Sequence, residues 1–192
     1  MAISRKPVVM GDERGSKAVA TVIAVAIVGI VLLGILLAMG QPLSFLFNKD
    51  KFEYEQAMNR AEVYFFADQY EEATAALEKV IEMAPEQVRP RYMLAISYAK
   101  TGYSEKSVEE FKKVLQMDPA HDGAMAGMAS VYLRLGMEEI ERLNYPKAEE
   151  HYIKALNQIA RAIKKAPGNQ EYKEIEKRIV EEKSRLDALR ND

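Results

Sequence analysis

The sequence predicts an all-α protein in which a solenoid of helix-turn-helix units follows a single membrane-spanning helix. Two observations carry this prediction. Residues 18–39 form a run of 22 residues without a charged side chain, and from about residue 54 the chain repeats itself with a period of 34 residues. The part after residue 54 has the length of one domain, and its apolar residues recur at helical spacing.

The apolar run predicts a transmembrane helix over residues 17–40. A helix through 18–39 would be about 33 Å long, which is enough to cross a hydrocarbon core of about 30 Å. A cleavable signal peptide is the alternative, because Ala38-Met39-Gly40 has the small-x-small pattern of a cleavage site, but such a peptide normally has an apolar core of about 7–15 residues. Pilin-type processing after Gly15 is a third alternative, and there Ala20 stands where Glu is usual.

The distribution of Lys and Arg predicts the orientation of this helix. The basic residues compared are Arg5, Lys6, Arg14 and Lys17 before the span, and Lys49 and Lys51 after it. Cytoplasmic flanks carry the excess of basic residues, so the N-terminus is expected in the cytoplasm and the C-terminal domain on the outer side of the cell inner membrane. Residues 1–16 are expected to be a disordered tail, and residues 41–53 a juxtamembrane linker.

The composition argues against catalysis and nucleic-acid binding. The chain has 27 Lys and Arg, 29 Asp and Glu, 2 His and no Cys. The lack of cysteine excludes disulfides, zinc–thiolate sites and cysteine nucleophiles. Both signs of charge are interleaved after residue 54, which leaves no basic surface for nucleic acid. Neither His121 nor His151 has metal-binding spacing, and phosphate-binding and nucleophile motifs are missing. The sequence therefore predicts a protein that is not an enzyme and has no cofactor.

The 34-residue period rests on matching residues in successive units. Residues 70–85 realign with residues 104–119. A small residue followed three positions later by tyrosine recurs at Ala61 and Tyr64, at Ala95 and Tyr98, and at Ala129 and Tyr132. These residues resemble the tetratricopeptide repeat, whose helix-turn-helix unit has this period. The resemblance implies repeats over residues 54–87 and 88–121.

The second helix of each of these units also fits that family. It carries small and bulky residues at fixed offsets and a closing proline: Ala73, Leu77, Val80 and Pro85, then Ser107, Phe111, Val114 and Pro119. The resemblance implies that the small residues let paired helices approach closely and that the bulky ones fill the gap to the next pair. Proline ends the helix, because the residue before it disfavours the α region. Arg60 departs from the pattern, since a Leu-like residue is usual there.

The third unit, residues 122–169, is longer than the others. Its second-helix signature, which begins at Tyr145, arrives seven residues late, and its closing Pro167 is a further seven late, which gives a unit of 48 residues. Seven residues are nearly two helical turns, so each insertion keeps the same face toward the core. This favours one long hairpin. A helix break at Gly136 is the alternative.

Residues 170–190 predict a last helix with one apolar face. A stack of repeats needs a helix with a polar outer face at its open end, so a capping helix is the favoured interpretation. A coiled-coil seam for dimerisation is the alternative, and Glu182 would then occupy a core position of the seam.

The resemblance places the binding surface on the concave side, which first-helix residues line in this family. Relatives that hold the acidic C-terminus of cytosolic chaperones carry Lys and Asn there, where this chain has Met58, Glu62, Tyr92 and Ile96. The implied surface is an apolar groove that could accept an amphipathic helix or an extended peptide. Alternatively, Phe65 and Phe66 pack under residues 43–53. The implied groove residues are Glu55, Met58, Glu62, Phe65, Phe66, Arg89, Tyr92, Ile96, Ala99, Lys100, Ala126, Ser130, Leu133 and Arg134.

The sequence thus favours a scaffold or adaptor that binds protein or peptide partners and the membrane through residues 18–39. Assembly, translocation or maturation of envelope or membrane proteins is the expected task, by analogy with single-span repeat proteins. A cytosol-facing targeting receptor is one alternative. An accessory subunit of a membrane complex, held by its span, is another.

Overall fold

The computed structural model describes residues 21–31, 34 and 49–190, and the chain divides into one unit over residues 1–52 and another over residues 53–192. In the first unit, residues 21–31 and 34 are helical with exposed side chains. Within the described ranges, no helix combines the length and the apolar character that crossing a membrane requires. Half of the expected span 17–40, the whole tail 1–16 and linker residues 41–48 fall outside those ranges, so the anchor remains a prediction.

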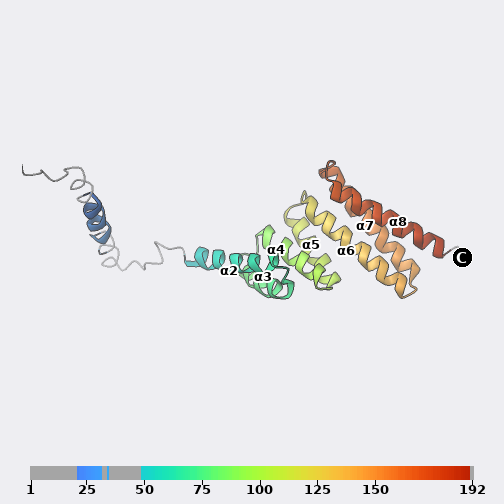
Figure 1. Cartoon of the computed structure of the whole chain (residues 1–192), viewed down its shortest axis with the longest axis horizontal. Helices are drawn as coiled ribbons and strands as arrows, with labels where there is room; N and C mark the ends of the chain where they lie inside the picture. The colour runs from blue at the N-terminus through green and yellow to red at the C-terminus, as the bar shows by residue number, and fades with distance from the viewer. Residues whose placement is uncertain (1–20, 32–33, 35–48, 191–192) are drawn as a thin grey trace, which may run out of the picture. The chain divides into compact units, whose positions relative to one another are not determined.

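Helices make up the described part of the chain from residue 49 to 190, which confirms the all-helical solenoid (Figure 1). The helices are α2 (Lys49–Phe66), α3 (Tyr70–Met83), α4 (Val88–Lys100), α5 (Ser104–Met117), α6 (Asp122–Glu141), α7 (Tyr145–Lys165) and α8 (Gln170–Leu189). From α3 onward each helix packs on the next, and α6 also contacts α8. Helix α2 begins at Lys49, so the last five residues of the expected linker, 49–53, are helical.

The small residues of the repeat allow the helices to pair closely. Ala61, Ala95 and Ala129 are all fully buried, and Ser107 is buried against the preceding helix, where its Oγ donates to the Ala95 carbonyl over 2.7 Å. Larger side chains fill the layers between pairs, among them the buried ring of Phe111. The resulting core has two clusters, one built from α2, α3 and α4 and one that extends from α4 to α8.

Each closing proline sets the start of the next helix. Helices α4, α6 and α8 begin three residues after Pro85, Pro119 and Pro167. Two of these starts are capped by side chains, which supply acceptors for backbone N–H groups that lack helical partners. The His121 Nδ1 accepts from the Ala124 N–H over 3.1 Å, and the Asn169 Oδ1 accepts from the Glu171 N–H over 2.9 Å.

The third unit is one long hairpin. Helix α6 has 20 residues and α7 has 21, and α6 continues through Gly136 without a break. The glycine is required by packing: a Cβ atom at Gly136 would lie 2.5 Å from Cε1 of Tyr152, whose side chain is fully buried on α7. The close approach of the two helices therefore depends on this glycine–tyrosine pair.

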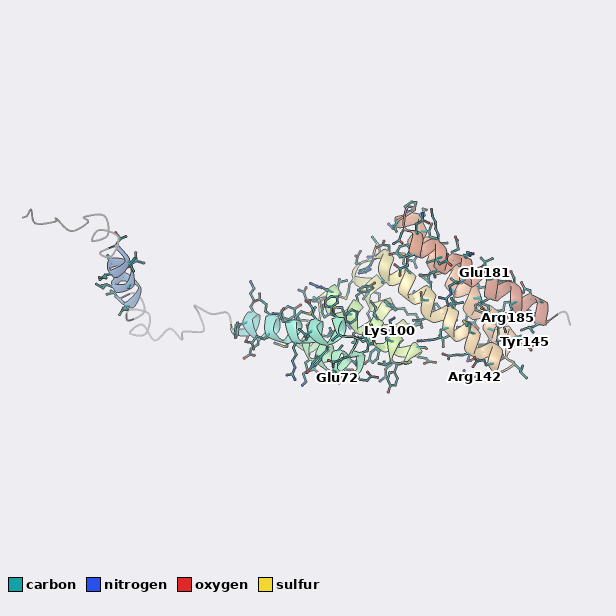
Figure 2. The ribbon with its side chains drawn as sticks, viewed as in Figure 1. Glu72, Lys100, Arg142, Tyr145, Glu181 and Arg185 are labelled. Atoms are coloured by element: carbon teal, nitrogen blue, oxygen red, sulfur yellow. The ribbon has the colours of Figure 1, made fainter. Side chains whose placement is uncertain are left out.

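A buried carboxylate holds the tip of this hairpin. Glu139 is only 3% exposed and accepts hydrogen bonds of 2.9 Å from Arg142, Asn144 and Lys147, which lie on both sides of the turn. Figure 2 labels Arg142 at this tip. The turn itself contains Leu143 in the left-handed region, at φ +59°, so the donors to Glu139 also fix an uncommon backbone conformation.

Stability of the hairpin is expected to fall in acid because of Glu139. Hydrogen bonds, first from Lys147 and then from Arg142, hold the pKa of Glu139 below its ordinary value of 4.5 against the opposing effect of burial. A lowered pKa in the folded state adds stability above the pKa of the unfolded chain, and this is lost as the pH falls through the folded-state value. Glu139→Gln should therefore lower stability at pH 7 and remove part of its loss in acid. Thermal unfolding between pH 7 and pH 3 measures this, and an unchanged pH dependence would contradict it.

Helix α8 packs on α6 and α7 and buries Tyr172, Ile179 and Leu186. Its other face carries exposed charged residues such as Lys173, Glu174 and Arg178. This is the arrangement expected of a helix that covers the apolar face of the last pair.

Candidate peptide-binding groove

A groove of about 400 Å³ lies between α4, α6 and α8. Helices α4 and α6 run in the same direction beside it, since Tyr92 and Gly123 meet near the start of the helices while Arg134 binds the Ala99 carbonyl near the end of α4. The lining residues are Tyr92, Ile96, Ala99, Lys100, Phe111, Gly123, Ala126, Gly127, Ser130, Val131, Arg134, Glu171, Tyr172 and Ile175.

Two glycines one helical turn apart on α6 allow aromatic rings to pack at the base of the groove. A Cβ atom at Gly127 would lie 2.4 Å from Cζ of Phe111, and one at Gly123 would lie 2.8 Å from the Tyr92 hydroxyl. Both aromatic rings therefore pack directly against the backbone of α6. Phe111 is 1% exposed and gives the groove a fixed apolar base.

The end of the groove nearest the helix starts combines aromatic rings with carboxylates. The Tyr92 ring packs on the imidazole of His121, with centroids 4.6 Å apart. Across the groove, the Tyr172 hydroxyl donates to Asp122 Oδ2 over 3.2 Å. Exposed Glu171 lies beside them on α8. This end therefore carries negative charge next to tyrosine hydroxyls.

Both tyrosines remain neutral hydrogen-bond donors near pH 7. Burial raises the pKa of Tyr92, and the carboxylates of Glu171 and Asp122 raise it further. Burial, followed by Asp122, raises the pKa of Tyr172 to about 12. A ligand at this end therefore meets neutral hydroxyls and the two carboxylates.

The opposite end of the groove is basic. Lys100, labelled in Figure 2, is exposed at the end of α4, with its Nζ 6.0 Å from the centroid of the Tyr70 ring. The Arg134 guanidinium is fixed by donating to the Ala99 carbonyl and, over 2.9 Å, to Ser104 Oγ. Its Nε lies 3.8 Å from a Glu138 carboxylate oxygen, which offsets part of its charge. Lys100 is thus the more exposed cation of this end.

The structure divides the residues that sequence reasoning assigned to one surface. Seven of them line this groove: Tyr92, Ile96, Ala99, Lys100, Ala126, Ser130 and Arg134. Leu133 does not, because it is only 4% exposed and belongs to the core cluster that includes Ile179 and Leu186 of α8. Leu133 lies where α8 completes the core over this part of α6, so it is not part of this groove, and its role in partner binding stays a prediction.

The predicted residues of the first unit lie elsewhere, together with Arg89 of the second. Glu55, Met58, Glu62 and Arg89 line a separate, smaller pocket of about 320 Å³, in which Arg89 and Glu62 form an ion pair of 3.0 Å. Met58 is mainly a core residue at 8% exposure. Phe65 packs edge-on to Tyr70, while Phe66 is 71% exposed. Neither phenylalanine lines either pocket. Most of segment 43–53, their expected cover, lies outside the described residues.

Sequence reasoning missed the contributions of α8 and of the α6 glycines. Glu171, Tyr172 and Ile175 form one wall of the groove, although α8 was interpreted only as a cap. A signal was present: α8 begins three residues after Pro167, as α4 and α6 begin three residues after their prolines. Helix α8 thus takes the place of a first helix in a following unit.

Within the described ranges, no three His, Cys, Asp or Glu residues are arranged to hold a metal ion. The histidines are not simply solvated. His121 caps α6, and His151 is half-buried with its ring stacked near Tyr132, at 6.0 Å between centroids. Burial lowers the pKa of His151, and the cations Lys154 and Lys147 add to this effect.

Comparison with known families matches residues 54–87 and 88–121 to the tetratricopeptide repeat. Over 88 residues the chain is 32% identical to the TPR repeat-containing thioredoxin TTL4 of Arabidopsis thaliana, which covers 46% of this chain. The chain spans 13% of the length of that relative.

Solved structures share the fold at low identity. A thermophilic tetratricopeptide-repeat protein of Thermus thermophilus superimposes with a TM-score of 0.60 at 16% identity, covering 70% of each chain. The second such domain of human RPAP3, solved with the HSP70 peptide SGPTIEEVD, gives a TM-score of 0.57 at 15% identity, covering 68% of this chain and 97% of the other.

Proposed function

Residues 54–121 form two tetratricopeptide repeats, and from this premise we propose that the chain is a membrane-anchored scaffold that binds a segment of a partner protein in the groove between α4, α6 and α8. The observation that carries the proposal is the groove itself. It has a volume in the range of ligand-binding clefts, a fixed apolar floor and polar groups at its two ends.

The groove is suited to an extended segment. The groove volume of about 400 Å³ is near the lower end of ligand-sized pockets. An α-helix with its side chains is about 10–12 Å across, which is wide for a groove of this volume. An extended chain instead places single side chains into such a groove. Ile96 and Ile175, which are half-buried, would contact its apolar side chains.

The acidic chaperone peptide seen with the RPAP3 domain is not the expected ligand. Relatives that bind such peptides are expected to carry Lys and Asn at positions where this chain has Met58, Glu62, Tyr92 and Ile96. The structure of the first pair adds that Met58 is buried and that Glu62 is paired with Arg89. These residues supply no cation for a terminal carboxylate.

Filling the groove with a large side chain tests whether partners bind there. Ser130 is exposed on α6, and its Oγ donates to the carbonyl four residues earlier, that of Ala126. Ser130→Trp would place a large ring in the groove and should change stability by no more than about 1 kcal/mol, as for other surface positions. We expect the full chain with this change to lose at least tenfold of the partner captured by crosslinking in native membranes.

Ser184→Trp is the matched control. Ser184 is also exposed in mid-helix, and its Oγ donates to the carbonyl of Val180, again four residues earlier. Ser184 lies on α8 and does not line the groove. Partner capture that fell equally in both variants, or in neither, would contradict the groove as the binding site.

The membrane anchor is proposed from the uncharged run 18–39. Because burying this run of 22 uncharged residues in hydrocarbon is effectively irreversible, the intact chain of 21.7 kDa should remain in the membrane fraction through alkaline carbonate washing. A C-terminal alkaline phosphatase fusion should be active if the solenoid lies outside the cytoplasm, as the basic flank predicts. A shortened product beginning near Gln41 would overturn the uncleaved anchor. An inactive fusion would favour the cytosol-facing receptor.

A further inference from the structure

The charges at the two ends of the groove point to a particular ligand chemistry. We infer that the groove selects an extended peptide with a cationic side chain at one end and a carboxylate at the other, separated by about three small or apolar residues. This inference rests on the proposed function of the groove and concerns which peptides it accepts.

The acidic end can hold a cation. Glu171 is exposed at this end and lines the groove, and behind the Tyr172 hydroxyl the Asp122 carboxylate, which does not line the groove, accepts its hydrogen bond. The hydroxyls of Tyr92 and Tyr172 line the same end. A Lys or Arg side chain would therefore find the Glu171 carboxylate and hydroxyl oxygens as acceptors together.

The basic end can hold a carboxylate. Arg134 is anchored by Ala99 and Ser104, so its guanidinium is a fixed charge, offset in part by Glu138, and its position does not depend on a ligand. Lys100 stands at the end of α4 with an exposed side chain that can move toward a carboxylate. Exposed Ser130 adds a hydroxyl between the basic end and the centre.

The distance between the ends sets the spacing of the two ligand charges. Tyr92 and Lys100 lie on the same helix, and a rise of 1.5 Å per residue separates them by about 12 Å. An extended chain advances about 3.3 Å per residue, so charges four positions apart span roughly the same distance. Between the ends the groove offers Ile96, Ala126 and Ile175, which suits small or apolar residues at the three central positions.

The test uses capped peptides with Ala-Leu-Ala centres and four charge patterns. These have Arg first and Asp last, Asp first and Arg last, Arg at both ends, or Asp at both ends. Both mixed patterns are included because an extended chain can lie in either direction. The Kd of each for the full chain in detergent micelles is measured by NMR titration of the peptide signals. We expect one or both mixed patterns to bind at least tenfold more tightly than either like-charged peptide.

Two charge reversals should switch this preference. Lys100→Glu should make the Arg-Arg peptide the tightest ligand, and Glu171→Lys should do the same for the Asp-Asp peptide. The matched controls are Lys173→Glu and Glu174→Lys, which alter exposed residues of α8 outside the groove and should leave the order unchanged.

The outcomes test separately whether the groove prefers a charge pattern and whether it is the binding site. Equal binding of all four peptides, abolished by Ser130→Trp, would overturn the charge preference while leaving the groove as the binding site. Binding of none of the peptides would overturn the inference too, and the proposed function would then be judged by the partner capture of Ser130→Trp alone. Binding that Ser130→Trp does not affect would contradict both.

Discussion

Gly136→Ala is expected to destabilise the solenoid by about 1–3 kcal/mol, the range for overpacking a filled core. The added methyl group would lie 2.5 Å from Cε1 and 2.7 Å from Cδ1 of Tyr152. That ring is fully buried, so it can move away only by displacing core side chains around it. The thermal unfolding midpoint of the full chain, followed by circular dichroism, measures the loss.

A matched control and a compensating change make this prediction specific. Gly168→Ala should have little effect by comparison, because a Cβ there would meet no atom within 4 Å. Combining Gly136→Ala with Tyr152→Leu should restore part of the stability relative to the sum of the two single changes, since the smaller side chain leaves room for the methyl group. Strictly additive effects would show that the two residues do not share one packing site.

Glu110→Ala is expected to lower the free energy of unfolding by about 2–4 kcal/mol, because it leaves the largely buried guanidinium of Arg91 without its partner. Glu110 on α5 accepts from Arg91 Nη1 over 2.9 Å and from Lys113 Nζ over 2.6 Å. The Arg91 side chain is 13% exposed and also donates to the Pro85 carbonyl at the end of the first repeat. Arg91 therefore connects the repeat junction to the helix that carries Phe111.

The neighbouring residue supplies the control for Glu110→Ala. Glu109→Ala removes the same group from an exposed position on the same helix and should change stability by less than about 0.5 kcal/mol. Chemical unfolding of both variants measures the difference. Equal losses in the two would mean that the Arg91–Glu110 pair adds nothing beyond a surface charge.

The pairing of helices could be predicted from sequence because it depends on residue size at fixed positions. Ala61, Ala95 and Ala129 recur every 34 residues, and all three are fully buried. The length of the third hairpin followed from the two insertions of seven residues, since these preserve the helical face. Such features are local or periodic, and a sequence displays them directly.

The shape of the groove could be predicted only in part, because it depends on packing between units. Tyr92, Ile96 and Lys100, which the family pattern implies as groove residues, line this groove, whereas Leu133 lies in the core around α8. The position of α8 after Pro167 was a sign that this helix would form part of the surface, but it did not indicate that Glu171 would stand at the acidic end. The role of Gly127 was equally hidden, since it becomes clear only when the Phe111 ring is seen against it.

Site-specific photo-crosslinking tests directly whether a partner segment binds in the groove between α4, α6 and α8. A photoreactive amino acid is placed at Ser130 in the full chain, or at Ser184 as the control, and irradiated in native membranes. We expect a discrete crosslinked partner from position 130 and none from position 184, with the position-130 product competed away by excess of the mixed-charge peptides. Crosslinks from position 184 or from the hairpin tip at Leu143, with none from position 130, would contradict this expectation.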